Sequence, residues 1–188
     1  SVSAKDGGTF SGTIAAAGLS TSSLGTSNFR AGVNAGNSIE AGGNYNTVVG
    51  DEAGTAITTG DGNTAVGYQA LDANTTGNHG TAVGYQALST STTAAGNTAV
   101  GYQAYLSNTT AVDGVAIGKF ALTANTTGNH NVAVGKSSLS ANTTGASNTA
   151  VGKDALEANT TGNINTAVGL SALATNTEGL NNSALGVN

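Results

Sequence analysis

Five side chains in the middle of the chain are of types that perform acid–base chemistry or bind metal ions. Asp51 and Glu52 are adjacent, Asp61 follows in the same stretch, and paired carboxylates of this kind act in general acid–base catalysis or hold Ca²⁺. His79 and His130 are the two histidines of the chain. No lysine or histidine adjoins the carboxylates, and there is no nucleophile elbow, phosphate loop or ligand cluster. We therefore predict no catalytic, cofactor-binding or metal-binding residue and no enzymatic activity. The carboxylates are interpreted as a charged cap and the histidines as solvated turn residues.

The elements that position these residues follow a strict repeat. A glycine recurs at a constant interval of 17 residues, at Gly50, Gly67, Gly84, Gly101, Gly118, Gly135, Gly152, Gly169 and Gly186. A fixed period this short is typical of stacked coils and not of a globular core. We therefore predict an all-β fold, a β-solenoid of 17-residue coils.

Each repeat unit contains a strand signal and a turn signal. The unit at 63–79 reads NTAVGYQALDANTTGNH. Thr and Val favour β-structure, so T-A-V is predicted as a short strand with Thr64 and Val66 on one face and Ala65 on the other. The following glycine predicts a positive φ or a lack of space for a Cβ. N-T-T-G predicts a turn in which Asn bonds its own backbone. We expect about two strands and two bends per coil, stacked at about 4.8 Å into a rod of about 40 Å.

The repeat divides the chain into three segments. Residues 1–28 lack the pattern and are expected to form a strand pair, a cap or a connector. Residues 29–45 are expected to form a degenerate capping coil, because Gly32 precedes Gly50 by 18 residues instead of 17. Residues 46–188 form the repeat array. Since the chain begins at Ser1 and stops within a repeat, we expect a fragment or a processed product.

The composition restricts the partners. The chain of 188 residues has 29 Gly, no Cys and a net charge of −5, and only five Lys and Arg. Disulfides and thiolate metal sites are excluded, and nucleic acid is an unsuitable partner because so few cations cannot neutralise a phosphate backbone. No apolar stretch is long enough to span a membrane. Each coil contains only about one Val, one Leu and several Ala, which is little apolar surface to bury in the core of a single chain. We therefore predict self-association with the Ala or the Val column along a shared axis.

The repeats resemble those of a known class of surface fibre. N-T-A-V-G-Y-Q-A-L-x-x-N-T-T-G is similar to the head repeats of trimeric autotransporter adhesins and to repeat arrays of phage tail-fibre proteins, over residues 46–188. The resemblance implies a homotrimeric, left-handed β-roll outside the cell or on a virion. In such a trimer, three symmetry-related histidines at position 79 or 130 are an alternative metal site.

Three ladders of repeated side chains are expected along the rod, and the tyrosine and threonine ladders are candidate binding surfaces. Tyr68, Tyr85 and Tyr102 follow successive glycines, and such a ladder either stabilises the rod by stacking or, with the adjacent glutamines, binds a cell-surface glycan. Lys119, Lys136 and Lys153 continue the same column, with Asp154 beside the last. Thr pairs such as 75–76 and 126–127 form the third ladder, which either belongs to ordinary turns or orders water as in ice-binding solenoids. We predict a structural or adhesive fibre segment; the alternative is an ice-binding solenoid.

Overall fold

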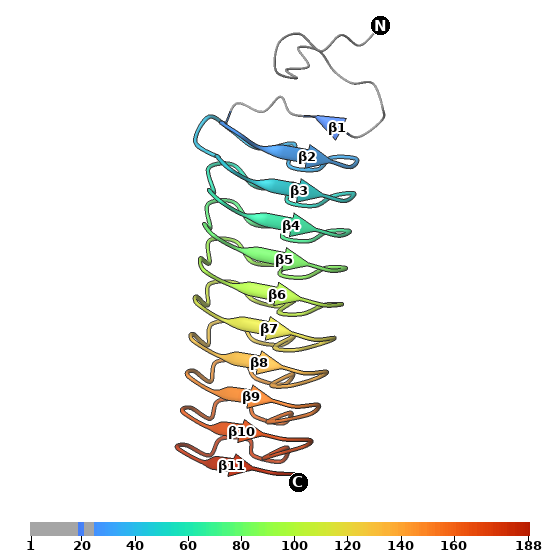
Figure 1. Cartoon of the computed structure of the whole chain (residues 1–188). Coiled ribbons are helices and arrows are strands. Elements are labelled where there is room, and N and C mark those ends of the chain that lie inside the picture. The colour runs from blue at the N-terminus through green and yellow to red at the C-terminus, as the bar shows by residue number, and fades with distance from the viewer. Residues whose placement is uncertain (1–18, 21–24) are drawn as a thin grey trace, which may run out of the picture.

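The computed structural model describes residues 19–20 and 25–188 as a rod of about nine stacked coils (Figure 1). Nearly all of the predicted segment 1–28 therefore lies outside the described residues. The described part contains one sheet of eleven strands in sequence order, so each coil pairs with the coils before and after it. The strands are β1 Leu19–Ser20, β2 Phe29–Ala31, β3 Thr47–Val49, β4 Thr64–Val66, β5 Thr81–Val83, β6 Thr98–Val100, β7 Val115–Ile117, β8 Val132–Val134, β9 Thr149–Val151, β10 Thr166–Val168 and β11 Ser183–Leu185.

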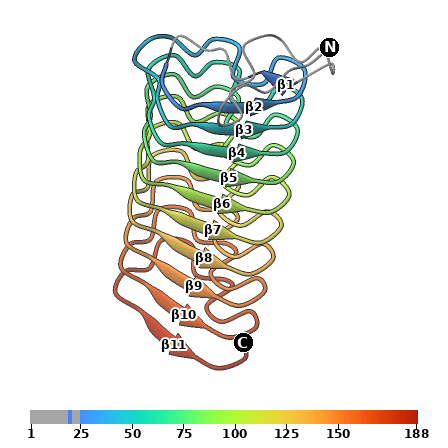
Figure 2. The same cartoon turned by 45° about the horizontal axis from the view of Figure 1, so that its top comes forward.

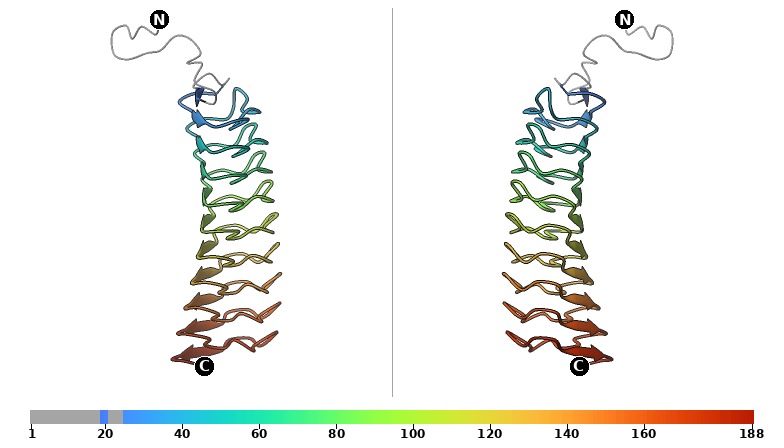
Figure 3. Two further views of the ribbon diagram at one scale, coloured as in Figure 1. Left: turned by 90° about the vertical axis from the view of Figure 1, so that its right-hand side faces the viewer. Right: turned by 90° about the vertical axis from the view of Figure 1, so that its left-hand side faces the viewer.

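Each coil has one strand, so the prediction of two strands per coil is wrong. The strands from β2 to β11 are parallel and pair in register, for example Ala65 opposite Ala82. They lie one above another on one side of the rod, and the rest of each coil closes the other sides (Figures 2 and 3). That remainder is turns, although its N–H groups still bond across coils, as from Leu122 N to Ser138 O at 3.1 Å.

Left-handed backbone conformations explain why the rest of the coil is not extended. Three positions in the coil 63–79, Gln69, Leu71 and His79, have φ of 53°, 54° and 57°. The same positions in other coils repeat these values, although an L-residue pays about 1–2 kcal/mol to adopt them. Gly54 and Gly62 occupy two of these columns in the preceding coil, where glycine adopts a positive φ without this strain because it has no Cβ. The coil thus bends at fixed positions, mostly without the help of glycine.

The repeated glycines up to Gly169 have both a positive φ and no space for a Cβ, the two alternative reasons predicted for a glycine at this position. Gly67 has φ +130°, and a Cβ on it would lie 2.5 Å from the carbonyl oxygen of Gly84 in the next coil. Gly118 has φ +133° and the same 2.5 Å approach to Gly135. Each repeated glycine up to Gly169 therefore permits the bend after the strand and also the close stacking of successive bends.

The core of the rod combines a small apolar seam with buried asparagines. Ala65, Ala70 and Leu71 are at most 2% exposed, and their equivalents in the other central coils are similarly buried. The Ala column of the strands thus faces the chain's own core, as predicted for the face opposite Thr64 and Val66. It cannot also line a shared axis, so that version of the predicted seam is wrong.

Buried asparagine side chains fill the part of the core that a count of apolar residues leaves out. Asn63 is 1% exposed; its Oδ1 accepts from Gly80 N at 2.8 Å, and its Nδ2 donates to Gly77 O at 2.9 Å. The first residue of most coils repeats this pattern. The asparagines of N-T-T-G form a second ladder, in which Asn142 Nδ2 donates to Asn125 Oδ1 at 2.6 Å and to Gly145 O at 2.9 Å. Because buried amides with satisfied hydrogen bonds are stable in a core, one chain closes its own interior.

One coil departs from this pattern by a matched pair of residues. Tyr105 replaces the usual Leu, is fully buried, and accepts a hydrogen bond on Oη from Asn125 Nδ2 at 3.2 Å. Gly114 replaces the usual Asn at the start of the next coil, and a Cβ there would lie 2.5 Å from Tyr105 Oη. The larger ring is thus accommodated by the loss of a neighbouring side chain.

The coil 29–45 stacks on the array through the same ladder. Phe29 pairs with Thr47 and Ala31 with Val49, and Gly32 has φ +137° like the later glycines. β1 pairs antiparallel with β2, so the ladder is covered by another strand at this end.

Candidate binding surfaces

The three tyrosines form a continuous stack along the rod. Ring centroids are 5.4 Å apart between Tyr68 and Tyr85 and 5.1 Å between Tyr85 and Tyr102, with interplanar angles of 25° and 8°. Beyond Tyr102, Phe120 makes an edge contact at 5.5 Å, and Lys119 Nζ lies 5.4 Å from the Tyr102 centroid. The faces between successive rings are therefore occupied. A sugar is limited to the ring edges, the hydroxyls and the outer face of the stack.

The glutamines beside this stack bond along the rod axis. Gln86 Nε2 donates to Gln69 Oε1 and Gln103 Nε2 to Gln86 Oε1, both at 2.8 Å, and Gln69 Nε2 donates to Glu52 Oε2 at 2.7 Å. The negative charge of Glu52 is the main cause that raises the pKa of Tyr68 above its usual value. Because each amide is bonded to its neighbour, the glutamines reinforce the stack instead of extending toward a ligand.

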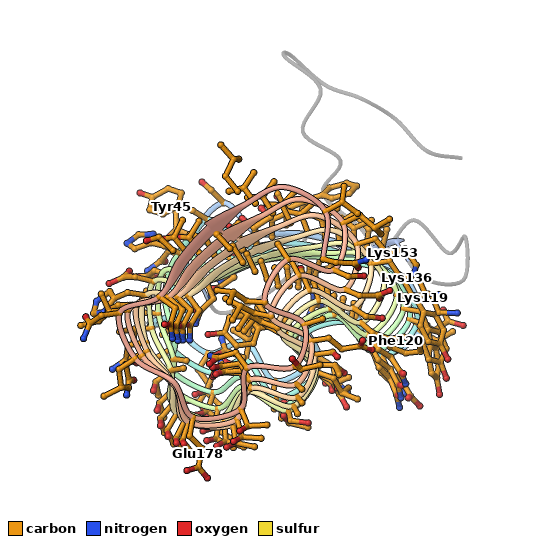
Figure 4. All side chains as sticks on the ribbon, turned by 90° about the horizontal axis from the view of Figure 1, so that it is seen from below. Tyr45, Lys119, Phe120, Lys136, Lys153 and Glu178 are labelled. Atoms are coloured by element: carbon orange, nitrogen blue, oxygen red, sulfur yellow. The ribbon has the colours of Figure 1, made fainter. Side chains whose placement is uncertain are left out.

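The three lysines continue the tyrosine column at one corner of the rod, one behind another (Figure 4). Lys119 Nζ lies 4.9 Å from the Phe120 centroid, a cation–π distance. Lys153 Nζ contacts the Asp154 carboxylate as predicted, and this hydrogen bond is the main cause that raises the pKa of Lys153. Among the residues that the structure describes, Lys136 has neither kind of neighbour, so its exposed amine is the most available of the three.

The predicted carboxylates act mostly as acceptors for the coil itself. Asp51 Oδ1 accepts from Val33 N at 3.0 Å, and Asp61 Oδ1 accepts from Asn44 N at 2.6 Å. Both bonds tie one coil to the preceding one, so these residues are part of the stacking. They do not converge with a base.

The two histidines lie apart on the last position of their coils. His130 Nε2 is 3.8 Å from Asp113 Oδ2, and both side chains are largely exposed. Among residues 19–20 and 25–188, no three His, Cys, Asp or Glu side chains gather in a way that could hold a metal ion. A histidine ring across a trimer stays the untested alternative to the predicted solvated turn histidines.

The two threonines of each turn differ in their bonding. The first donates its hydroxyl to the next coil, as from Thr75 Oγ1 to Thr92 O and from Thr126 Oγ1 to Thr143 O, both at 3.1 Å. The second is exposed in seven consecutive coils and forms none of the side-chain hydrogen bonds seen for the first, at Thr59, Thr76, Thr93, Thr110, Thr127, Thr144 and Thr161. Only one of the two predicted columns therefore has free hydroxyls.

The outer face of the sheet is a further surface, uncharged and mostly β-branched. It carries Thr64 and Val66 and their equivalents from β3 to β11, and none of these positions holds Asp, Glu, Lys or Arg. Val100, Ile117 and Val151 on it are 36%, 40% and 36% exposed. These side chains follow one another along the sheet instead of being scattered, so this face is a candidate contact surface.

In comparisons with protein-family models, with curated proteins and with solved structures, the chain matches none. In the described part of the chain, no helix has the length and apolarity that crossing a bilayer requires.

Proposed function

We propose that the chain is a non-catalytic structural or adhesive segment of an extracellular fibre, on a cell surface or a virion. It acts as a stiff shaft or head that presents a binding tip. In this proposal three copies associate in parallel as left-handed rolls, as the resemblance to adhesin heads and tail fibres implies.

The observation that carries the proposal is that each coil bonds to the coils directly before and after it, in most coils through the same first asparagine. Asn148 N donates to Asn131 Oδ1 at 2.9 Å, and Asn165 N donates to Asn148 Oδ1 at the same distance. Such nearest-neighbour stacking produces a quasi-one-dimensional body whose length follows the number of repeats. A rod of this kind suits a spacer better than a catalyst.

The outer sheet face supports the trimer in this proposal. Since the core closes within one chain, self-association is not needed to bury the Ala column. Val100, Ile117 and Val151 on the outer sheet face nevertheless remain 36–40% exposed within the part of the chain that the structure describes. Three such faces around an axis bury apolar surface without desolvating any charge.

Sedimentation equilibrium tests the trimer, since one chain weighs 18.0 kDa. Three times that mass is expected, and a monomer at all concentrations would sink the trimer. Introducing lysine at Val100 and Ile117 should dissociate it. Lysine at Thr76 and Thr93, which are also exposed but lie in the turns, is the matched control and should leave the mass unchanged.

Ice binding remains a second candidate because of the exposed Thr column. Seven hydroxyls in consecutive coils, at about 4.8 Å spacing, form a regular array that is free to bond water. Thermal hysteresis in dilute solution tests this reading. Replacing Thr110 and Thr127 by valine preserves the side-chain shape, removes two hydroxyls and should reduce the thermal hysteresis. If the unchanged chain freezes as buffer does, ice binding is rejected.

A further inference from the structure

The residues that follow the repeated glycines form one exposed line along the rod, here named the axial ridge. Backbone bonds hold the line in register: Gln86 N donates to Tyr68 O, and Ser137 N donates to Lys119 O, both at 2.9 Å. Every member is exposed. In order, the ridge contains Val33, Asp51, Tyr68, Tyr85, Tyr102, Lys119, Lys136, Lys153 and Leu170, and Val187 lies one coil beyond.

The ridge is complementary to itself when it is read in reverse. About Tyr102 as the centre, the two apolar ends Val33 and Leu170 exchange places, and Asp51 exchanges with Lys153. Tyr68 and Tyr85 exchange with Lys136 and Lys119. An acid thus meets a base, Tyr68 and Tyr85 each meet an amine, and Tyr102 meets its own copy.

From this order we propose that two copies of the chain pair antiparallel along the axial ridge, with a two-fold axis at Tyr102. A two-fold interface is isologous, so a contact between two different rungs occurs twice. Asp51 of each copy lies against Lys153 of the other. Tyr68 and Tyr85 lie against lysines of the other copy, and the two Tyr102 rings meet at the axis. This pairing is separate from the proposed trimer, which uses the outer sheet face.

The opposite orientation is electrostatically unfavourable. If two ridges met in parallel, Lys119, Lys136 and Lys153 would each face their own copy, and Asp51 would face Asp51. Antiparallel pairing removes these like-charge contacts. The chain itself shows that the ridge supports an amine against a ring, because Lys119 Nζ lies 5.4 Å from the Tyr102 centroid.

Charges next to the ridge adjust the strength of the pairing. Glu52 adds a carboxylate beside Asp51 and Tyr68, which favours an incoming lysine. At the other end Asp154 contacts Lys153, so Lys136 opposite Tyr68 is the stronger contributor. Eight steps of about 4.8 Å make a contact of about 38 Å, but it is narrow. We therefore expect a weak, salt-sensitive interface of the small class, below about 1,200 Å².

Cysteine cross-linking tests both the surface and the orientation, because the chain has no cysteine of its own. Asp51→Cys and Lys153→Cys are made in separate chains, mixed, and treated with a short bis-maleimide. The mixture should yield cross-linked dimers well above either variant alone. Thr59→Cys mixed with Thr161→Cys is the matched control, since these residues lie in the same two coils on another face.

Two results would overturn the proposal: a mixture no more cross-linked than the control, or Lys153→Cys chains that link to each other. Tyr68→Cys with Lys136→Cys repeats the test without touching the Asp51 bond to Val33 N. Raising the salt should reduce the specific product, and Lys136→Glu should weaken association about tenfold. The trimer is scored independently by cross-linking of Val100→Cys to itself, so either idea can fail alone.

Discussion

Replacing Gly118 by alanine tests why a glycine ends every strand. The single added Cβ would stand 2.5 Å from the carbonyl oxygen of Gly135, 2.7 Å from its carbon and 3.1 Å from Lys136 N. These are backbone atoms, so they cannot rotate away, and overpacking of this kind costs about 1–3 kcal/mol. The φ of +133° adds about 1–3 kcal/mol of strain for an L-residue. We expect Gly118→Ala to destabilise the rod by about 2–6 kcal/mol.

Gly186→Ala separates the two contributions. Gly186 has φ +137°, but a Cβ there would meet nothing within 4 Å, so only the backbone strain is expected. Because coils of a repeat protein can open individually, amide hydrogen exchange of the affected coils is the appropriate assay, with urea denaturation for the global effect. If Gly118→Ala proved no worse than Gly186→Ala, the close approach of successive bends would play no part in the glycine repeat.

Four further predictions concern the interior and the bends. Gly114→Asn alone should crowd Tyr105 and lower the free energy of unfolding, measured by urea denaturation, by about 1–3 kcal/mol. Adding Tyr105→Leu should restore this stability, and strictly additive effects of the two changes would contradict the matched pair. Asn142→Ala removes two donated hydrogen bonds and should cost about 2–3 kcal/mol, visible as a lower Tm; an unchanged Tm would mean that the ladder is dispensable. Ser147 has φ 58°, so Ser147→Gly should raise the free energy of unfolding by about 0.5–1 kcal/mol, because the relief of backbone strain exceeds the entropy cost of glycine. Ala146→Gly is the control and should only destabilise the rod. Burial raises the pKa of Tyr105 above its unfolded value of 10.0, so its stabilising effect is complete below pH 10 and declines as the pH rises beyond; Tyr105→Leu should therefore flatten the alkaline limb of the stability profile.

The sequence predicted those features that depend on one residue type at one position. Thr64, Ala65 and Val66 alternate as a strand requires, and Asn74 does bond the backbone of its own turn, to Gly77. Such features are local, because a β-branched residue, an Asn or a Gly restricts its own backbone wherever it occurs. The β-solenoid and its 17-residue coils followed from these positions.

The features that were missed depend on several residues at once. Nothing in the identity of Leu71 or Gln69 signals a positive φ, since both residues disfavour it and adopt it because the stacked coils impose it. The buried role of Asn63 was also hidden, because a polar residue before a strand normally indicates a solvated turn. Counting only Val, Leu and Ala therefore underestimated the core and made the Ala column seem available for a partner.

The candidate surfaces were located better than they were interpreted. The Tyr and Thr columns lie where the period placed them, on the outside of the rod. Their bonding required the structure, since the sequence does not say that Gln69 and Gln86 bond to each other or that Thr75 donates to the next coil. The axial ridge needed the register, which joins Val33 to the array despite its longer step.

The asparagine ladders also bear on how such a gene can change. Asn131, Asn148 and Asn165 each receive the next coil by one bond of 2.9 Å from its first N–H, so any coil of this kind fits beneath any other. An in-frame duplication or loss of a whole repeat by recombination should then give a chain that still folds, only longer or shorter. Rod length becomes a trait that selection can adjust in whole coils, without a new core having to evolve.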